Sequence, residues 1–266
     1  MYKAFYGLKE NPFSITSDPS FFYSSSCHQE AFSHLAYGIQ QRKGILVITG
    51  EIGTGKTTLC RALLNTLDNR TKTAFILYPN FSELQLLQLI MKDFGLTPKN
   101  KNKAALIEAL NEFLLQESSH GNNVVVIIDE AQNLKESQLE QVRLLSNLET
   151  EKEKLLQLIL VGQPELGDKL KLSSLRQLNQ RVAVRYHIRP LAKAELKNYI
   201  THRLNVAGAS RELTFTPEAV EEIYLYSSGT PRLVNILCDR ALLAGFVGET
   251  FTIDYHMVKK CIEEVG

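Results

Sequence analysis

The chain has 266 residues, of which 44% are hydrophobic and 22% charged, and 30 basic residues against 29 acidic ones leave a formal net charge of +1. This composition is typical of a globular protein with one large domain, or a large and a small one, and it excludes collagen-like and disordered chains. The even charge balance also argues against a protein that coats nucleic acid without sequence preference, although basic residues can still gather on one face.

The cysteines and histidines show no pattern of a disulfide framework or a metal site. Four cysteines lie far apart without Cys-x-x-Cys spacing, and the six histidines lack the spacing of metal ligands. We therefore expect reduced thiols, and histidines that are exposed or hydrogen-bonded. No apolar run approaches the roughly 20 residues needed to cross a bilayer, and MYKAFYGLKENPF lacks the order of a signal peptide. These features predict a cytoplasmic chain without a membrane span.

From about residue 45 to residue 190, short runs rich in β-branched residues alternate with longer stretches of helical periodicity. This alternation predicts a parallel sheet with helices on both faces, a doubly wound α/β domain. The predicted strands are 45–49, 73–77, 124–128, 156–161 and 182–188. The intervening helices are predicted within 59–67, 82–94, 103–116 and 136–149, where Leu, Ile and Phe recur at helical intervals.

After Pro190 the pattern becomes helical, with predicted helices at 192–207, 217–227, 231–247 and 254–264. We therefore predict an α/β domain over 1–190, in which 1–40 form an N-terminal leader, followed by a small helical lid domain over 191–266. No Pro/Ser/Gly-rich linker separates the two parts. The junction near Arg189 and Pro190 is expected to be a hinge rather than a tether.

A phosphate-binding motif lies between the first predicted strand and the helix that follows it. The segment GEIGTGKT fits the P-loop pattern GxxxxGK[ST] in the strand-to-helix context that gives the pattern meaning. Glycines allow backbone N–H groups to point inward at phosphates, and the helix N-terminus adds partial positive charge. We predict that Lys56 reaches the β- and γ-phosphates of ATP and that the Thr57 hydroxyl binds Mg²⁺. The predicted nucleotide-binding residues are Gly50, Glu51, Ile52, Gly53, Thr54, Gly55, Lys56, Thr57 and Thr58.

An apolar strand that ends in two acids supplies the second half of such a site. Asp129 and Glu130 follow the run VVVII about 70 residues after the P-loop. We predict that Asp129 holds the Mg²⁺ shell and that Glu130 orients and polarises the attacking water. A strand that ends in an acid is also common as a cap or at a surface, but its place after a P-loop favours the catalytic interpretation. A glutamate beside the Mg²⁺ aspartate favours an ATPase over a switch that merely stores nucleotide.

Six segments together resemble the AAA+ ATPase family of general secretion pathway protein A. They are MYKAFYGLKENPF, TGEIGTGKTT, VVVIIDEAQNL, LSNLETEKEKLLQLILVGQPEL, LNQRVAVRYHIRPL and SSGTPRLVNILCDRAL, and they run over essentially the whole chain. The resemblance implies a P-loop NTPase with a five-stranded parallel AAA+ sheet and a helical lid. It also implies a self-assembling, Mg²⁺-dependent ATPase.

The resemblance also implies roles for individual residues. Gln163 matches the sensor-1 position that helps to place the lytic water, with capping of a turn as the alternative. Arg232, in the segment GTPR, matches the sensor-2 arginine that reaches the γ-phosphate, a task that suits a permanently charged, planar guanidinium. Arg181 matches an arginine finger presented to a neighbouring subunit's nucleotide, with Arg176 as its rival. The aromatic leader around Phe5 either lines the adenine site or anchors the terminus.

Two functions from different classes follow from this resemblance, with a third interpretation beside them. The first is an ATPase that assembles with itself and drives assembly of a cell-envelope apparatus of the type II secretion or pilus kind, through a membrane-anchored partner at the inner membrane. The second is a DNA-bound regulator of transposition or replication, in which basic residues would line a pore: Lys99, Lys101, Lys103, Arg185 and Arg189. For Arg185 and Arg189, charges at the edge of the sheet are an equal alternative. The third is an adaptor that binds ATP but hydrolyses it poorly. Family members often continue into a membrane helix and a peptidoglycan-binding domain, so we expect either part of a longer protein or a short member.

Overall fold

The computed structural model describes residues 2–77, 82–151, 153–210 and 212–265. The chain divides into two compact units. The sheet unit comprises Glu30–Ile52 and Cys60–Ile188, and the helical unit comprises Met1–Gln29, Gly53–Leu59 and Arg189–Gly266. The functional boundary predicted at residue 190 stays a prediction.

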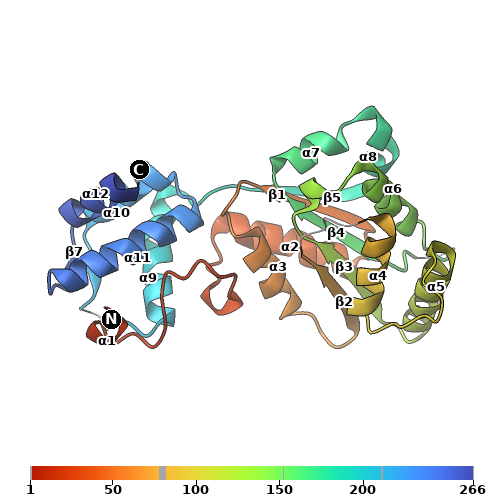
Figure 1. Ribbon diagram of the computed structural model, residues 1–266, viewed down its shortest axis with the longest axis horizontal. Coiled ribbons are helices and arrows are strands. Elements are labelled where there is room, and N and C mark those ends of the chain that lie inside the picture. The colour runs from red at the N-terminus through yellow and green to blue at the C-terminus, as the bar shows by residue number, and fades with distance from the viewer. Residues whose placement is uncertain (1, 78–81, 152, 211, 266) are drawn as a thin grey trace. The chain divides into compact units, whose positions relative to one another are not determined.

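The sheet unit is built on five strands, all parallel, in the order β2-β3-β4-β1-β5 (Figure 1). The strands are β1 (Ile45–Gly50), β2 (Thr71–Ile76), β3 (Asn123–Ile128), β4 (Gln157–Gly162) and β5 (Val182–Ile188). Strands β3 and β4 are buried at nearly every position, which requires cover on both faces of the sheet. The predicted α/β class and its five parallel strands are confirmed, and strand ends shift by at most two residues.

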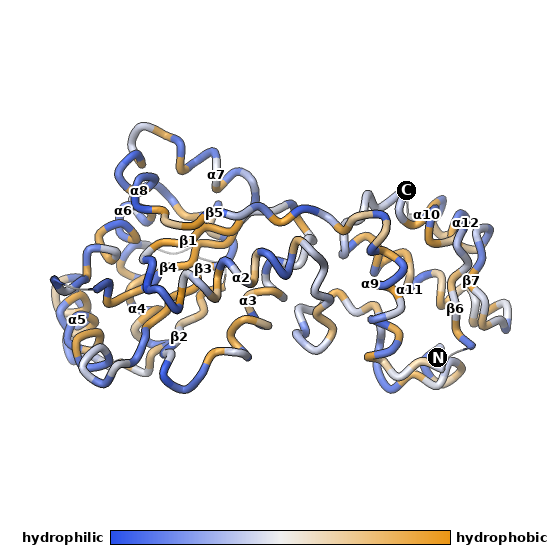
Figure 2. Tube along the Cα trace, turned by 180° about the vertical axis from the view of Figure 1, so that it is seen from behind, coloured by the Kyte–Doolittle hydropathy of each residue, from blue (hydrophilic) through white to orange (hydrophobic). Residues whose placement is uncertain are grey.

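Helices along the chain cover this sheet. They are α2 (Ser26–Gln40), α3 (Lys56–Leu64), α4 (Glu83–Asp93), α5 (Lys103–Ser119), α6 (Glu136–Leu145), α7 (Pro164–Leu170) and α8 (Arg176–Arg181). On one face, a single apolar cluster joins alternate residues of four strands to buried leucines of α4 to α8. The tube in Figure 2 shows the strands as the most hydrophobic part of this unit. Helix α4 begins with a capping box between Ser82 and Gln85, which satisfies backbone N–H groups of its first turn.

The helical unit has its own core. It contains α9 (Lys193–Val206), α10 (Pro217–Ser227), α11 (Pro231–Val247) and α12 (Tyr255–Val265), with a two-stranded sheet of β6 (Thr214–Phe215) and β7 (Thr252–Ile253). Prolines in the first turn of α10 and α11 remove an N–H that a helix start leaves unpaired. The four predicted helices are present, whereas the short parallel strand pair was not predicted.

The N-terminal segment packs into the helical unit as an aromatic anchor. Helix α1 (Tyr2–Phe5) ends in Phe5, whose ring stacks on Phe251 at 4.9 Å and meets Phe246 edge-on at 5.5 Å. Tyr6 is 1% exposed and donates its hydroxyl to carbonyls of α11 and the turn after it. The buried guanidinium of Arg203 donates to the carbonyls of Pro12 and Ser14 at 2.6 and 2.8 Å. These contacts support the interpretation in which the aromatic leader anchors the N-terminus.

Candidate nucleotide site

The P-loop connects the end of β1 at Gly50 to the start of α3 at Lys56. Gly53 and Gly55 have φ angles of +79° and +91°, in the left-handed region that glycine adopts without a steric cost. Thr54 and Lys56 are 0% and 6% exposed, whereas Ile52 at the tip is 58% exposed. The loop therefore turns back on itself and directs its C-terminal half into a helix N-terminus, where backbone N–H groups and the helix dipole attract anions.

The carboxyl edge of the parallel sheet brings three predicted site segments to the same side of the sheet unit. Gly50 ends β1, Asp129 directly follows β3, and Gln163 directly follows β4. Strand β4 pairs with both β1 and β3, so these strand ends are neighbours. Ligands of open α/β sheets bind at this edge.

Asp129 and Glu130 form a tight turn directly after β3. Asp129 is 1% exposed, its N–H donates to the carbonyl of Ile76 at 2.9 Å, and its Oδ1 accepts from the N–H of Glu130 at 2.9 Å. Glu130 has a φ of +52° and a ψ of +35°, a left-handed conformation that costs a non-glycine residue about 1–2 kcal/mol. Such strained residues persist where surrounding bonds maintain them, and they cluster at functional sites.

The Glu130 carboxylate lies in a network of glutamines. Its Oε2 accepts from Nε2 of Gln132 at 2.6 Å and from Nε2 of Gln163 at 3.5 Å. Oε1 of Gln132 accepts in turn from the Gln163 N–H at 3.1 Å. Gln163 is also the N-cap residue of α7, as the turn-capping alternative expects, although among the described residues its side chain makes no capping hydrogen bond. The structure therefore brings Glu130 and Gln163 together, as their predicted roles require.

Gln132 and Lys169 are neighbours of the candidate site that the sequence analysis did not name. Lys169 donates from Nζ to the carbonyls of Gln132 and Leu134 at 2.5 and 2.9 Å, and so ties α7 to the short helix η2 (Ala131–Asn133). Gln132 stands two residues after Glu130 in the motif DEAQN. The sequence gave no signal of its bond to Gln163, because the two glutamines are 31 residues apart.

The two candidate arginine fingers belong to one short helix. Arg181 ends α8 and donates to Oγ of Ser146 at 3.4 Å, whereas Arg176 begins the helix, and both are exposed. Arg181 also lies close enough to Glu140 to help lower the pKa of that carboxyl, after the larger effect of the bidentate Arg143. Either guanidinium is available at the surface of this subunit.

In the helical unit, the start of α11 packs on the second half of the P-loop. The N–H of Arg232 donates to the carbonyl of Gly53 at 3.2 Å. A Cβ on Gly53 would lie 2.6 Å from Cβ of Arg232, so only glycine permits this approach. Arg232, which was predicted to bind nucleotide, therefore lies beside the P-loop although the two are far apart in the sequence.

His28 is a second residue of the helical unit that contacts the P-loop. It is 3% exposed, and its Nε2 lies 2.8 Å from the carbonyl oxygen of Thr54. Burial lowers the pKa of the imidazole, against smaller raising effects of the Thr54 bond and the Glu195 charge. His28 fits the expectation of a hydrogen-bonded histidine, but its contact with the P-loop was not predicted.

The donors present suit the group that a P-loop implies. The Thr57 hydroxyl and the Asp129 carboxylate are oxygen ligands, which Mg²⁺ prefers, and one or two protein ligands suffice when phosphates and waters complete its shell. Thr57 stands in the first turn of α3, half-buried, and Asp129 is buried. The residues therefore fit Mg²⁺ with a nucleotide.

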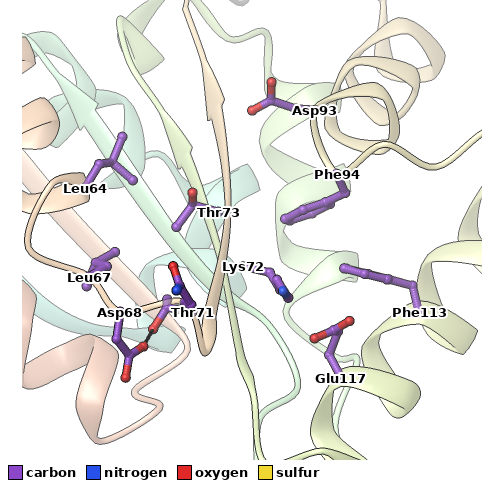
Figure 3. Close-up of a pocket in the computed structure, with 11 residues that line it drawn as sticks. Leu64, Leu67, Asp68, Thr71, Lys72, Thr73, Asp93, Phe94, Phe113 and Glu117 are labelled. Carbon is purple, nitrogen blue, oxygen red and sulfur yellow. Dashed lines mark hydrogen bonds between the residues drawn. The ribbon is translucent and has the colours of Figure 1, made fainter.

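The hollow drawn in Figure 3 is not part of this site. It has a volume of about 550 Å³ and lies beside the amino-terminal half of edge strand β2, at Thr71 to Thr73. Its acids serve the local fold: Asp68 accepts from the Thr71 hydroxyl at 3.1 Å, and Asp93 accepts from the N–H of Phe75 at 2.5 Å. A carboxylate on a strand edge also discourages pairing with another strand.

Comparison with known proteins agrees with this geometry. Residues 39–170 match the family described as AAA domain. Over 267 aligned positions, which cover 100% of this chain and 49% of the relative, the sequence is 46% identical to general secretion pathway protein A of Aeromonas hydrophila. The chain therefore contains an AAA domain and resembles general secretion pathway protein A over its whole length. The chain spans about half the length of that relative, and the resemblance inferred from the six segments is confirmed.

Solved structures show the same fold at low sequence identity. The Aeropyrum pernix ORC2 protein in ADPNP-ADP complexes is 16% identical, with a TM-score of 0.68 over 89% of this chain and 66% of that one. Drosophila ORC bound to DNA is 19% identical, with a TM-score of 0.67 over 90% and 60%. The Thermotoga maritima RuvB Holliday junction branch migration motor is 20% identical, with a TM-score of 0.59 over 89% and 69%. At these identities the likeness concerns the fold alone, and the expected AAA+ P-loop fold with a helical C-terminal part is confirmed.

Proposed function

We propose that this chain binds ATP and hydrolyses it to ADP and phosphate with Mg²⁺. The observation that carries the proposal is the carboxyl edge of the sheet, where the P-loop begins and where Glu130 meets Gln163. A strained glutamate, bonded to two glutamine amides beside a buried aspartate, is an arrangement suited to water activation rather than to nucleotide storage.

Different residues of the site bind different parts of the triphosphate. The N–H groups of the P-loop and of the α3 N-terminus bind phosphate oxygens, and the Lys56 ammonium adds a point charge at the β- and γ-phosphates. Thr57 and Asp129 hold Mg²⁺, which when bound neutralises the charge that develops on the phosphate oxygens. Arg232 adds a guanidinium directed at the γ-phosphate.

Catalysis then depends on how the Glu130 carboxylate is held. Glu130 accepts a proton or hydrogen bond from the attacking water, while the amides of Gln132 and Gln163 fix its orientation. Gln163, bonded to Glu130, helps to position the same water.

We further propose that the enzyme acts as a homo-oligomer, a dimer or a ring, with Arg181 as the finger that completes a neighbour's site. Support comes from the exposure of Arg181 at the end of α8 and from the likeness of the chain to AAA+ proteins. A trans-acting guanidinium stabilises charge on the transferred phosphoryl group, and its loss typically costs about 10³-fold or more in turnover.

Mixing two inactive variants tests the finger. Arg181→Ala retains an intact nucleotide site, and Lys56→Ala retains an intact finger, so hydrolysis should reappear at mixed interfaces, to roughly a quarter of the wild-type rate at equal amounts of a dimer with random pairing. The measurement is the ATPase rate against mixing ratio. Rescue by Arg176→Ala instead of Arg181→Ala would reassign the finger, and no rescue at any ratio would remove the trans mechanism.

The cellular role that we propose is assembly of a cell-envelope apparatus of the type II secretion or pilus kind, through a membrane-anchored partner at the inner membrane. It is supported by the name of the 46% identical relative, general secretion pathway protein A. Among the residues that the structure describes, no helix is both long and apolar enough to span a membrane. On this proposal the chain works in the cytoplasm or peripherally at the inner membrane.

The alternative is a DNA-bound regulator, and it draws on the likeness to the fold of DNA-bound ORC. Two of the five basic residues considered for DNA are engaged locally. Lys103 forms an ion pair with Glu83 at 2.9 Å, and the Arg185 guanidinium donates to the backbone and side chain of Asn179 at 2.9 and 2.5 Å. These bonds weaken the DNA alternative, but Lys99, Lys101 and Arg189 remain candidates for DNA contacts.

One measurement separates these functions: the ATPase rate per subunit against protein concentration, with and without duplex DNA, at two salt concentrations. We expect a rate that rises with concentration and is unaffected by DNA. Stimulation by DNA that falls steeply with salt would transfer the protein to the DNA-binding class, because phosphate contacts release counterions. Absence of hydrolysis under every condition would refute the ATPase.

A further inference from the structure

His28 lies in the first turn of α2, and both of its ring nitrogens face hydrogen-bond partners. Its Nε2 faces the Thr54 carbonyl at 2.8 Å, and its Nδ1 faces Oγ of Ser25 at 2.6 Å. Ser25, His28 and Thr54 are all at most 3% exposed. These contacts lie within the helical unit, which contains both residues 1–29 and residues 53–59.

The partners determine which ring nitrogen carries the proton. A carbonyl oxygen only accepts, so Nε2 is protonated and donates to Thr54, and Nδ1 accepts from the Ser25 hydroxyl. Burial lowers the pKa of the ring and keeps this neutral tautomer dominant at neutral pH. The charged group nearby is Glu195, whose Oε1 and Oε2 accept from the N–H groups of Ser26 and Ala192 at 2.8 and 3.0 Å. The imidazole is therefore a fixed donor with one target.

Two successive P-loop carbonyls are held by sequence-distant donors. The Gly53 carbonyl accepts from the N–H of Arg232, and the Thr54 carbonyl accepts from His28. In a trans peptide the carbonyl and the following N–H point in opposite directions. The N–H of Thr54 therefore points away from the Arg232 donor, and the N–H of Gly55 points away from the His28 donor. Successive N–H groups on one side of a loop form an anion-binding nest.

This part of the loop needs an external restraint. Gly53 and Gly55 both have positive φ, and a glycine passes between conformations that a Cβ would forbid, so sterics alone do not fix the peptides between them. The His28 ring closes on the backbone here, because a Cβ on Gly55 would lie 3.1 Å from its Nε2. A side-chain hydrogen bond therefore replaces steric restraint at the Thr54–Gly55 peptide.

We propose that His28 is a positioning residue of the phosphate site, which holds the Thr54–Gly55 peptide so that its N–H faces the bound nucleotide's phosphates. The inference rests on the proposed nucleotide-binding function. His28 itself touches neither substrate nor metal. It lowers the free energy of nucleotide binding by keeping the loop in its binding conformation before the nucleotide arrives.

Three variants isolate the donor. His28→Phe keeps a ring of similar size and loses the donor, His28→Gln keeps an N–H donor at similar reach, and Ser25→Ala removes the bond that fixes the tautomer. His202→Phe is the matched control, because His202 belongs to the same unit and its pKa is also lowered by burial. A thermal melt of each variant establishes that it is folded.

We expect His28→Phe to weaken ADP binding about tenfold and Ser25→Ala about threefold, as one hydrogen bond of a buried carbonyl is lost or loosened. His28→Gln should stay within about threefold of wild type, and His202→Phe should match wild type. The KM for ATP should rise with the Kd while kcat changes less than threefold. This pattern is expected when the lost interaction binds the substrate and the transition state equally. Without nucleotide, amide exchange of the segment 50–58 should be faster in His28→Phe than in wild type.

The outcomes distinguish this inference from the proposed function. If wild type binds ADP, Lys56→Ala does not, and His28→Phe binds as wild type does, the positioning role is refuted and nucleotide binding stands. If His28→Gln is as weak as His28→Phe, the ring and not the donor matters, which also refutes it. A lower melting temperature with unchanged Kd assigns His28 a purely structural role. If wild type itself fails to bind adenine nucleotides, both proposals fall.

Discussion

Replacement of Lys56 by alanine is expected to weaken nucleotide binding about 100-fold or more. Lys56 is 6% exposed at the first position of α3, so its ammonium meets the phosphates where little water screens the charge. Removal of one partner from a buried charge pair costs about 3–5 kcal/mol, and each 1.4 kcal/mol is a factor of ten in Kd. No nearby cation in the P-loop replaces it, since GEIGTGKT contains a single basic residue.

Equilibrium titration with a fluorescent ADP analogue measures this effect directly. Lys171→Ala is a suitable control, because Lys171 is 74% exposed and pairs with Asp168 three residues earlier. An exposed pair of this kind contributes about 1 kcal/mol or less to stability and nothing to the proposed site. If Lys56→Ala and Lys171→Ala bound the analogue equally well, the P-loop would have no role in nucleotide binding.

The parts of the fold that could be predicted are those that local patterns encode. The five strands were identified because parallel strands buried on both faces are continuous apolar runs, as in β3 and β4. Helices α4 and α5 were identified because their buried leucines recur at helical intervals. The P-loop was recognised from eight consecutive residues and from their place between a predicted strand and a predicted helix, both of which are local features.

The parts that could not be predicted depend on contacts between distant residues. Helix α2 was treated as part of a leader, although the structure makes it a helix of 15 residues. Strands β6 and β7 have two residues each, which is too short for any alternation to show, and they pair between Thr214 and Thr252, far apart in the sequence. Local pattern carries no information about such pairing.

The site residues also differ in whether a local sequence pattern or a contact between distant residues determines their role. Asp129 and Glu130 are recognisable as acids after an apolar strand, but the left-handed conformation of Glu130 and its bonds to two glutamines arise only from tertiary structure. His28 looks like any isolated histidine in the sequence, and its role depends on a carbonyl 26 residues away. Chemistry-bearing residues are thus easier to predict than the residues that hold them in place.

Replacement of Glu130 by glutamine is expected to lower kcat about 100-fold or more while ATP binding changes less than about threefold. Glutamine is isosteric, and its carbonyl oxygen can accept from the Gln132 and Gln163 amides as the carboxylate does, so the network and the strained turn remain. What disappears is the negative charge and basicity that polarise the attacking water. General acid–base catalysis of this kind contributes about 10²–10⁴-fold.

Single-turnover hydrolysis and equilibrium binding, measured on the same preparation, separate chemistry from affinity. Glu165→Gln is the matched control, because it makes the same chemical change two residues from Gln163, at an exposed position of α7. A loss of kcat without a loss of affinity shows that Glu130 interacts more strongly with the transition state than with bound ATP. Near-normal turnover would mean that another residue activates the water. An equal loss of binding would instead place Glu130 among the ligands of the nucleotide, where its bonds to Gln132 and Gln163 would order the binding site rather than the water.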